Sequence, residues 1–249
     1  MFTLLSWNVL ADAYVRREHY PDAPEALLAP GARRAAVTEQ LASSGADVIG
    51  LQELDAETMR AAQARLAAWE GIYLPKGRGK PDGCGLFVRR EAAAIAATRP
   101  LEYSDGSGHV ALLAELVVDG RRVGVATTHV RWDPPKTPHA ERFATRQLSE
   151  LRDAAPAGIP WLLCGDFNVV PDDPALAILH QAGFVDVFAG SAHDVATANA
   201  NKRGRRIDFI FARDARAEPR PVPRIDDSTT MPSERFPSDH LAISARVDL

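Results

Sequence analysis

Short apolar runs alternate along the chain with stretches rich in alanine, arginine and glutamate. The apolar runs predict β-strands at residues 2–7, 46–53, 83–90, 110–120, 122–130, 159–167, 206–213 and 240–247. The stretches between them predict helices at about residues 31–44, 56–69, 138–153 and 173–182. Asp119-Gly120 separates two apolar runs and marks a tight hairpin, which argues against an all-parallel, doubly wound sheet.

The remaining stretches have little predicted structure and read as loops. They fall at about residues 12–30, 76–82, 131–138, 191–205 and 226–237. The chain has no internal repeat, no low-complexity tract and no long linker rich in proline, glycine or serine. We therefore expect a single domain spanning residues 1–249.

Composition narrows the functional classes. With 46% hydrophobic and 25% charged residues, the 249-residue chain has ordinary globular composition and enough apolar residues for a substantial core. A formal net charge of −4 does not support a protein that coats duplex nucleic acid. Cys84 and Cys164 lie in separate apolar runs and are interpreted as reduced core thiols. No apolar run reaches about 18 residues and no leader precedes the first strand, so we expect no membrane span and a cytoplasmic location.

Several predicted strands end in a polar residue that has no evident local structural purpose. Active sites in layered sheets are commonly built where strand ends meet loops, so these side chains are expected to share one pocket. They are Asn8, Glu53, His129, Asp166, Asn168, Asp208, Asp239 and His240.

Glu53 ends the apolar run that starts at Val48, which places its carboxylate at the mouth of the sheet. One interpretation is a solvated glutamate at a strand end. The functional alternative is a ligand for a hard cation, because Mg²⁺ prefers oxygen ligands. Asn8 offers an amide at a similar strand end, although an asparagine that simply forms a turn fits equally well.

The segment GDFN at residues 165–168 follows another apolar run. In an extended strand, Asp166 and Asn168 would point to the same side. A carboxylate and an amide held side by side can orient and deprotonate water and grip the phosphate that the water attacks. A plain turn would account for Asn168 but not for a carboxylate directly after the run IPWLLCG.

The apolar run RIDFIF contains one carboxylate, Asp208, and an unpaired buried carboxylate costs several kcal/mol. His240 in the segment SDH is a suitable partner, because a buried Asp–His hydrogen bond raises the pKa of the histidine. Asp239 would then be free to help hold a metal. The alternative for SDH is a helix N-cap, but the following segment HLAISARV alternates like a strand. His129, at another strand end, suits a phosphate oxygen.

Together these segments resemble the endonuclease/exonuclease/phosphatase superfamily. The motifs SWNVLADAY, LQE, GCGLF, TTHVRWDP, CGDFNVVPDD, RIDFIF and FPSDH occur in the family's order across about residues 2–245. Three of these motifs, SWNVLADAY, TTHVRWDP and CGDFNVVPDD, most resemble the branch that holds the poly(A) deadenylases, nocturnin and the Angel proteins. The resemblance implies an α/β fold like that of deoxyribonuclease I: a two-sheet, mixed and largely antiparallel β-sandwich with helices on both outer faces.

The resemblance also implies a phosphoester hydrolase that uses Mg²⁺, with Mn²⁺ as a substitute. By motif, Asn8, Glu53 and Asp239 would form the metal site. The catalytic residues would be Asp166, which activates water; Asn168, which positions water and phosphate; His129, which binds phosphate; and Asp208, which orients His240 to stabilise the transition state.

The sequence is less informative about the substrate. Arg205, just before the RIDFIF strand, is a candidate phosphate clamp, whereas the neighbouring Lys202 and Arg203 fit a solvated face equally well. Arg131 follows His129, and Trp132 could stack on a base or pack on the domain. Residues 12–30 and 76–82 are expected to rim the pocket.

The chain lacks partner-docking repeats and is shorter than the deadenylase domains, which puts poly(A) specificity in question. Single-stranded RNA or DNA, particularly at 3′ ends, is the favoured substrate. A phosphatase of a small molecule, such as a nucleotide 2′-phosphate, a cyclic phosphate or a lipid headgroup, is the alternative. A non-catalytic binding module is the least favoured, because every motif position is filled. We expect a monomer.

Overall fold

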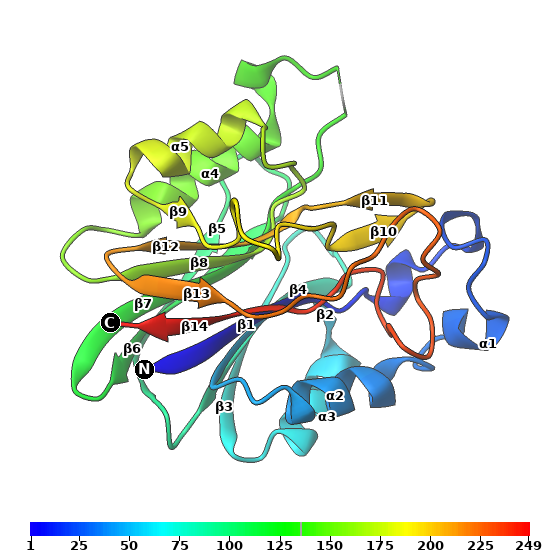
Figure 1. Cartoon of the computed structure of the whole chain (residues 1–249), viewed down its shortest axis with the longest axis horizontal. Coiled ribbons are helices and arrows are strands. Elements are labelled where there is room, and N and C mark those ends of the chain that lie inside the picture. Colours follow the sequence, from blue (N-terminus) through cyan, green and yellow to red (C-terminus); the bar gives the residue numbers. More distant parts are fainter. Residues whose placement is uncertain (135) are drawn as a thin grey trace.

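In the computed structural model, which describes residues 1–134 and 136–249, two six-stranded sheets stack face to face (Figure 1). The first sheet has the order β13 (Arg216–Pro219), β14 (Ile243–Asp248), β1 (Phe2–Asn8), β2 (Val48–Asp55), β4 (Asp82–Arg89), β3 (Trp69–Pro75). The second has the order β5 (Ala94–Glu102), β6 (Val110–Val118), β7 (Arg121–His129), β8 (Trp161–Asp166), β12 (Asp208–Arg213), β9 (Val185–Asp186). A separate hairpin joins β10 (Ala198–Ala200) to β11 (Arg203–Arg205).

Helices cover both outer faces of this sandwich (Figure 1). The α-helices are α1 (Glu25–Leu28), α2 (Arg34–Ser43), α3 (Ala56–Arg65), α4 (Phe143–Ala154) and α5 (Ala177–Gln181). Short 3₁₀ helices lie at Asp12–Tyr14, Arg17–His19, His139–Glu141 and Pro174–Leu176. Only β1–β2 and β7–β8 pair in parallel among the described strand pairs. The predicted α/β sandwich, mixed and largely antiparallel, is confirmed.

Both faces of the central strands are buried, which explains their nearly continuous apolar runs. Leu4 of β1 and Ile210 of β12 belong to the core between the two sheets. On the outer faces, Leu41 of α2 packs with Ile49 of β2, and Leu148 of α4 packs with Leu163 of β8. Cys84 and Cys164 are both buried and free, as expected of core thiols.

The predicted hairpin between β6 and β7 is confirmed. Val118 pairs with Arg121, and the two residues between them, Asp119 and Gly120, have φ values of 50° and 76°. Positive φ at both central positions is typical of a turn whose twist matches the flanking strands.

Several predictions of secondary structure are wrong at the edges of the sheets. The strand predicted to start at His240 begins at Ile243, and His240 makes only an isolated bridge with Ala198. Strands β3, β5 and β13 were not predicted. Each lies at a sheet edge: β3 is mostly half-buried, and β5 and β13 are more exposed. β5 also has an alanine-rich sequence, so pairing with a neighbouring strand overrides weak local preference.

The predicted loops contain more structure than expected. The stretch 12–30 holds two 3₁₀ helices and α1, and 191–205 holds the β10–β11 hairpin. Of the stretch 131–138, Pro135 lies outside the described residues. Within the described part of the chain, no helix is both long and apolar enough to cross a membrane.

Candidate active site

The predicted polar residues converge at one edge of the sandwich. A cavity of about 450 Å³ opens there. Its walls include Glu53, His129, Asp166, Asn168, Asp239 and His240. Asn8 and Asp208 are absent from the cavity walls, but each bonds directly to a residue that lines it. Residues more than 230 positions apart in the chain therefore share one site.

Strand register explains this convergence. In the second sheet, Asp166 at the end of β8 pairs with His129 at the end of parallel β7. On its other side, Asp166 pairs with Asp208, the first residue of antiparallel β12. In the first sheet, Asn8 at the end of β1 lies beside Gln52 of β2. The chemistry-bearing ends of the two sheets face each other across the cavity.

Special backbone conformations shape the site. Gly165 has φ 148°, and a Cβ there would lie 1.9 Å from the carbonyl oxygen of Thr128, so only glycine allows β7 and β8 to approach this closely. Glu53 has φ 51° at a register shift between β2 and β4. A non-glycine residue rarely adopts this conformation except where its surroundings hold it, as at functional sites.

Asn168 corrects one prediction. It does not extend the strand beside Asp166, because β8 ends at Asp166 and Asn168 has φ 51°. Its side-chain amino group instead donates to the carbonyl oxygen of Val130 at 2.9 Å and lies 3.0 Å from Nε2 of His129. The backbone N–H of Asn168 donates to Asp166 Oδ1 at 2.9 Å. A tight turn, not strand alternation, brings Asn168 to the site.

Asn8 bridges carboxylates from the two sheets. Its Nδ2 donates to Glu53 Oε1 at 3.1 Å and to Asp166 Oδ2 at 3.0 Å. Its amide oxygen, the atom that would bind a metal, accepts the backbone N–H of Leu10 at 3.0 Å. In this arrangement Asn8 holds the two carboxylates together, and its role as a metal ligand stays a prediction.

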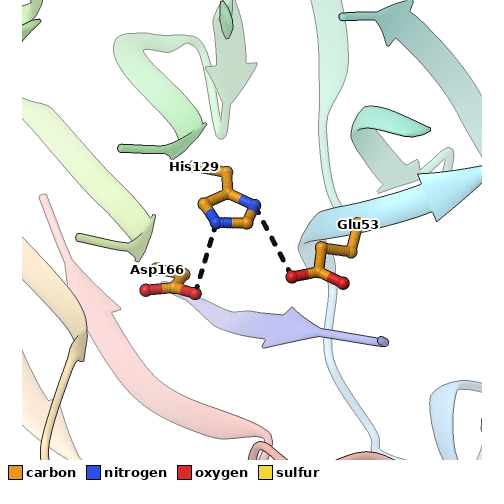
Figure 2. Close-up of side chains that lie close together, drawn as sticks. All are labelled: Glu53, His129 and Asp166. Carbon is orange, nitrogen blue, oxygen red and sulfur yellow. Dashed lines mark ion pairs between the residues drawn. The ribbon is translucent and has the colours of Figure 1, made fainter. Parts of the chain in front are cut away.

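Figure 2 shows Glu53 and Asp166 on opposite sides of His129. The closest contacts are 4.0 Å from His129 Nδ1 to Glu53 Oε1 and 3.6 Å from His129 Nε2 to Asp166 Oδ2. Burial, followed by the ammonium group of Lys76, lowers the pKa of His129 well below its usual value. The imidazole is therefore neutral at pH 7, and these two contacts are polar contacts instead of ion pairs.

Asp208 is bonded to His240, which answers why an apolar strand carries a carboxylate. His240 Nδ1 lies 2.9 Å and 3.1 Å from the two oxygens of Asp208. The hydroxyl of Thr197 also donates to Asp208 Oδ2, at 2.6 Å. Burial alone would lower the pKa of His240, but Asp208, Asp239 and Asp166 together raise it well above the usual value. His240 is thus an imidazolium whose Nε2 lies 3.7 Å from Asp166 Oδ2.

The donor atoms at this edge fit a divalent cation. Ligand atoms of Glu53, His129 and Asp166 lie within 4.8 Å of one another. Burial, and then the charge of Asp239, raise the pKa of Glu53, and burial raises the pKa of Asp166 to about 7. Both carboxylates remain costly to ionise even beside the imidazolium of His240, and a divalent ion would supply further positive charge. Mg²⁺ and Mn²⁺ favour carboxylate oxygens over imidazole.

Sequence reasoning missed several residues that hold this site together. Tyr20 donates its hydroxyl proton to Asp239 Oδ2 at 2.8 Å, and Tyr14 donates to Asp82 Oδ1 at 2.7 Å. Lys76 lies 2.6 Å from Asp82 Oδ2. These residues lie in a short 3₁₀ helix, in loops or at strand ends, none of which shows hydrophobic periodicity. The only available signal was that 12–30 and 76–82 were expected at the pocket rim.

That rim prediction is correct for one segment and wrong for the other. Tyr14, Arg16, His19 and Tyr20 line the cavity. Among the described residues, none between 76 and 82 does so, since Lys76 and Asp82 are paired behind His129.

The residues predicted to bind substrate differ in where the structure places them, and their role in binding stays a prediction. Arg205 lines the cavity, and its Nε is buried without a hydrogen-bond partner among the described residues. Arg131 does not line the cavity and stacks its guanidinium on the ring of Phe143 at 3.9 Å. Trp132 lies outside the cavity walls with 50% of its surface exposed.

The sequence and fold of the chain are similar to those of known proteins. Residues 5–240 match the model of the Endonuclease/Exonuclease/phosphatase family. CCR4-NOT transcription complex subunit 6-like-B of Xenopus laevis is 26% identical over 242 residues, which cover 74% of this chain and 44% of that protein. The CCR4-Not complex 3′-5′-exoribonuclease subunit Ccr4 of Schizosaccharomyces pombe is 26% identical over 227 residues, covering 68% of this chain and 33% of that protein.

The chain thus spans less than half the length of these curated relatives. Among solved structures, ANGEL2, a 2′,3′-cyclic phosphatase, in complex with adenosine-2′,3′-vanadate superimposes with a TM-score of 0.81 and 19% identity, covering 99% of this chain and 95% of that one. The chain belongs to the Endonuclease/Exonuclease/phosphatase family, and its similarity to CCR4-NOT subunits, nocturnin and ANGEL2 agrees with the predicted branch.

Proposed function

We propose that the chain is a Mg²⁺-dependent nuclease or phosphodiesterase that hydrolyses single-stranded RNA or DNA at 3′ ends. The observation that carries the proposal is that a carboxylate base and a positively charged imidazolium lie side by side in the wall of one cavity. Asp166 is a buried carboxylate whose pKa is raised to about 7, and the imidazolium of His240 lies 3.7 Å away. A base poised near neutral pH beside a fixed cation suits attack of water on a phosphoester. The 3′-5′-exoribonuclease Ccr4 of Schizosaccharomyces pombe, a relative of this chain, supports the choice of RNA ends.

Asp166 would act as the general base. One oxygen accepts the backbone N–H of Asn168 and the other accepts Nδ2 of Asn8, so the carboxylate is fixed in orientation. A fixed base reduces the entropy cost of reaching the reactive geometry. Proton transfer from water to Asp166 would leave hydroxide to attack phosphorus in line with the departing oxygen.

His240 would stabilise the charge that develops on the phosphoryl oxygens. Its Nδ1 proton is committed to Asp208, so Nε2–H remains to donate toward the cavity. His129 and Asn168 would supply further donors on the opposite side. A divalent ion held by Glu53, Asp166 and Asp239 would contribute Lewis-acid stabilisation of negative charge. Most of the rate acceleration would therefore be electrostatic and positional.

The second candidate is a phosphatase of a small phosphorylated molecule, and a specific contact favours it. The backbone N–H of Asn201, in the β10–β11 hairpin, donates to the carbonyl oxygen of His19 at 3.0 Å. Lys202 Nζ lies 2.7 Å from Asp22 Oδ2. Two segments that border the cavity are thereby joined, and the cavity volume of about 450 Å³ is that of a small-molecule site. A nucleotide 2′-phosphate, a cyclic phosphate or a lipid headgroup would fit this second function.

A substrate panel separates the two candidates. The chain would be incubated with Mg²⁺ and 5′-labelled RNA, single-stranded DNA, abasic duplex, RNA with a cyclic-phosphate end, and NADPH. We expect stepwise shortening of the single strands from the 3′ end, and no shortening when the metal is chelated. Free phosphate from the cyclic end or NADPH, with no shortening, would establish the phosphatase instead. Binding without turnover on any substrate would contradict both. A cytoplasmic location and a monomeric state stay predictions.

A further inference from the structure

Lys76 lies behind His129 and has no other evident purpose in the proposed chemistry. Its side chain is 1% exposed and that of Asp82 is 0% exposed, with Nζ 2.6 Å from Asp82 Oδ2. The same Nζ lies 3.1 Å from Nδ1 of His129. Lys76 is not among the residues that line the cavity, so it can affect a substrate only indirectly, through His129 or through Asp82 and its partner Tyr14, which does line the cavity.

His129 faces a hydrogen-bond donor at each ring nitrogen. Lys76 Nζ faces Nδ1, and Nδ2 of Asn168 lies 3.0 Å from Nε2. The amino group of Asn168 is identified as such because it also donates to the carbonyl oxygen of Val130 at 2.9 Å. An imidazolium carries a proton on both ring nitrogens and could accept a hydrogen bond from neither donor. A neutral imidazole has one nitrogen lone pair, so it can accept from only one of the two donors. One donor must therefore face an N–H.

Lys76 is the stronger donor of the two. Its hydrogen bond is charge-assisted, and such bonds are roughly twice as strong as bonds between neutral groups. Asp82 also holds the ammonium in place, and Tyr14 holds the other oxygen of Asp82 at 2.7 Å. The lone pair of His129 is consequently at Nδ1, and its proton is at Nε2, on the side of the cavity.

We propose that Lys76 is a positioning residue that sets the tautomer of His129 and so turns Nε2–H into a donor to a phosphoryl oxygen. Two donors, Nε2 of His129 and Nδ2 of Asn168, then lie 3.0 Å apart, and the carboxylate oxygen Asp166 Oδ2 lies beyond hydrogen-bond distance, 3.6 Å from Nε2. An anionic oxygen entering between them would accept from both. This inference rests on the proposed hydrolysis of a phosphoester at the same site.

The tautomer is measured directly by long-range ¹H–¹⁵N spectra of the histidine rings in ¹⁵N-labelled protein. We expect the His129 proton on Nε2 in the wild type. In Lys76→Met, Asn168 is the remaining donor at Nε2, so the proton should move to Nδ1, where Glu53 Oε1 lies 4.0 Å away. Lys76→Met leaves Asp82 buried without a counter-charge, so Lys76→Met/Asp82→Asn provides a second variant that removes both charges.

Kinetics supply the second readout. In Lys76→Met, His129 no longer donates from Nε2 to the developing negative charge. The value of kcat should therefore fall by on the order of 100-fold, with KM little changed. Lys76→Arg should restore part of kcat, since it keeps a buried cation donor. The matched control is Arg206→Met, which removes the cation of another buried ion pair, with Asp186, away from His129. It should lower the unfolding temperature and leave the His129 tautomer unchanged.

Each outcome bears on the inference independently of the substrate. A wild-type spectrum with the proton on Nδ1 overturns it, whether or not the variants fold. An unchanged tautomer in both variants overturns it as well. If the tautomer changes as expected but no phosphoester is hydrolysed by the wild type, the proposed function fails while the role of Lys76 in fixing His129 stands.

Discussion

Asp166→Asn should lower kcat by on the order of a thousandfold, because a general base typically contributes between a hundredfold and ten-thousandfold. The amide has nearly the shape of the carboxylate, so the bond from the backbone N–H of Asn168 can persist, whereas the bond from Asn8 Nδ2 is lost because an amino group cannot accept it. The substitution also removes a buried charge whose ionisation burial disfavours, so the unfolding temperature should not fall steeply. The measurement is kcat on whichever substrate the wild type cleaves, together with thermal unfolding.

Asp172→Asn is the matched control for this variant. Asp172 lies in the same CGDFNVVPDD segment but is exposed and absent from the cavity walls. It should retain wild-type turnover. Near-normal turnover in Asp166→Asn itself would remove Asp166 as the base.

Asp208→Asn is expected to have the second largest effect, a loss of on the order of 100- to 1000-fold in rate. The amide keeps a group beside His240 Nδ1 but loses the charge that contributes to raising the pKa of His240. His240 must be protonated to stabilise negative charge, so activity is lost as pH rises through its pKa. In the variant this pKa is lower, and the descending limb of the pH–rate profile should move to lower pH.

The control is Asp186→Asn, another buried carboxylate, in the strand β9 that pairs with β12. It should destabilise the fold without moving the descending limb. If Asp208→Asn abolishes folding and leaves no binding of metal or substrate, Asp208 is a structural group. An unmoved limb in a folded Asp208→Asn variant would show that the His240 charge does not depend on it.

The central strands could be predicted because both their faces are buried. The runs at 46–53, 159–167 and 206–213 are mostly apolar, and each forms a strand with a neighbouring strand on both sides. Edge strands lack this signal. Much of β5 faces solvent, and its sequence AIAATRPLE is stabilised as a strand by pairing with β6 over nearly its whole length. That pairing depends on tertiary structure, which local periodicity does not record.

The residues of the candidate site could be identified where a polar group interrupts an apolar run. Asp208 is the clearest case, since its burial demanded a partner and His240 is that partner. The Lys76–Asp82 pair could not be identified in this way, because both residues flank a loop with no periodic pattern. The sequence pattern predicted Asn168 at the site on the assumption of an extended strand, whereas a tight turn with φ 51° brings it there.

The position of residues in the outer part of the site was harder to predict, for a related reason. Arg131 and Trp132 follow the catalytic strand β7 directly, yet neither lines the cavity. From the sequence, a loop residue can be located only as close to the end of the strand that it follows. Where its side chain points depends on packing, here the stacking of Arg131 on Phe143.

Titration of the chain with Mg²⁺ by calorimetry at about pH 6 and about pH 8 tests the central claim most directly, namely that the converging carboxylates hold a divalent cation. Both Glu53 and Asp166 have raised pKa values, about 7 for Asp166, so more of each is ionised at the higher pH and binding should tighten. Glu53→Gln should weaken binding strongly at both pH values, whereas Glu70→Gln, at an exposed position of β3, should not. Binding that is unchanged by Glu53→Gln, or that weakens as pH rises, would contradict the account.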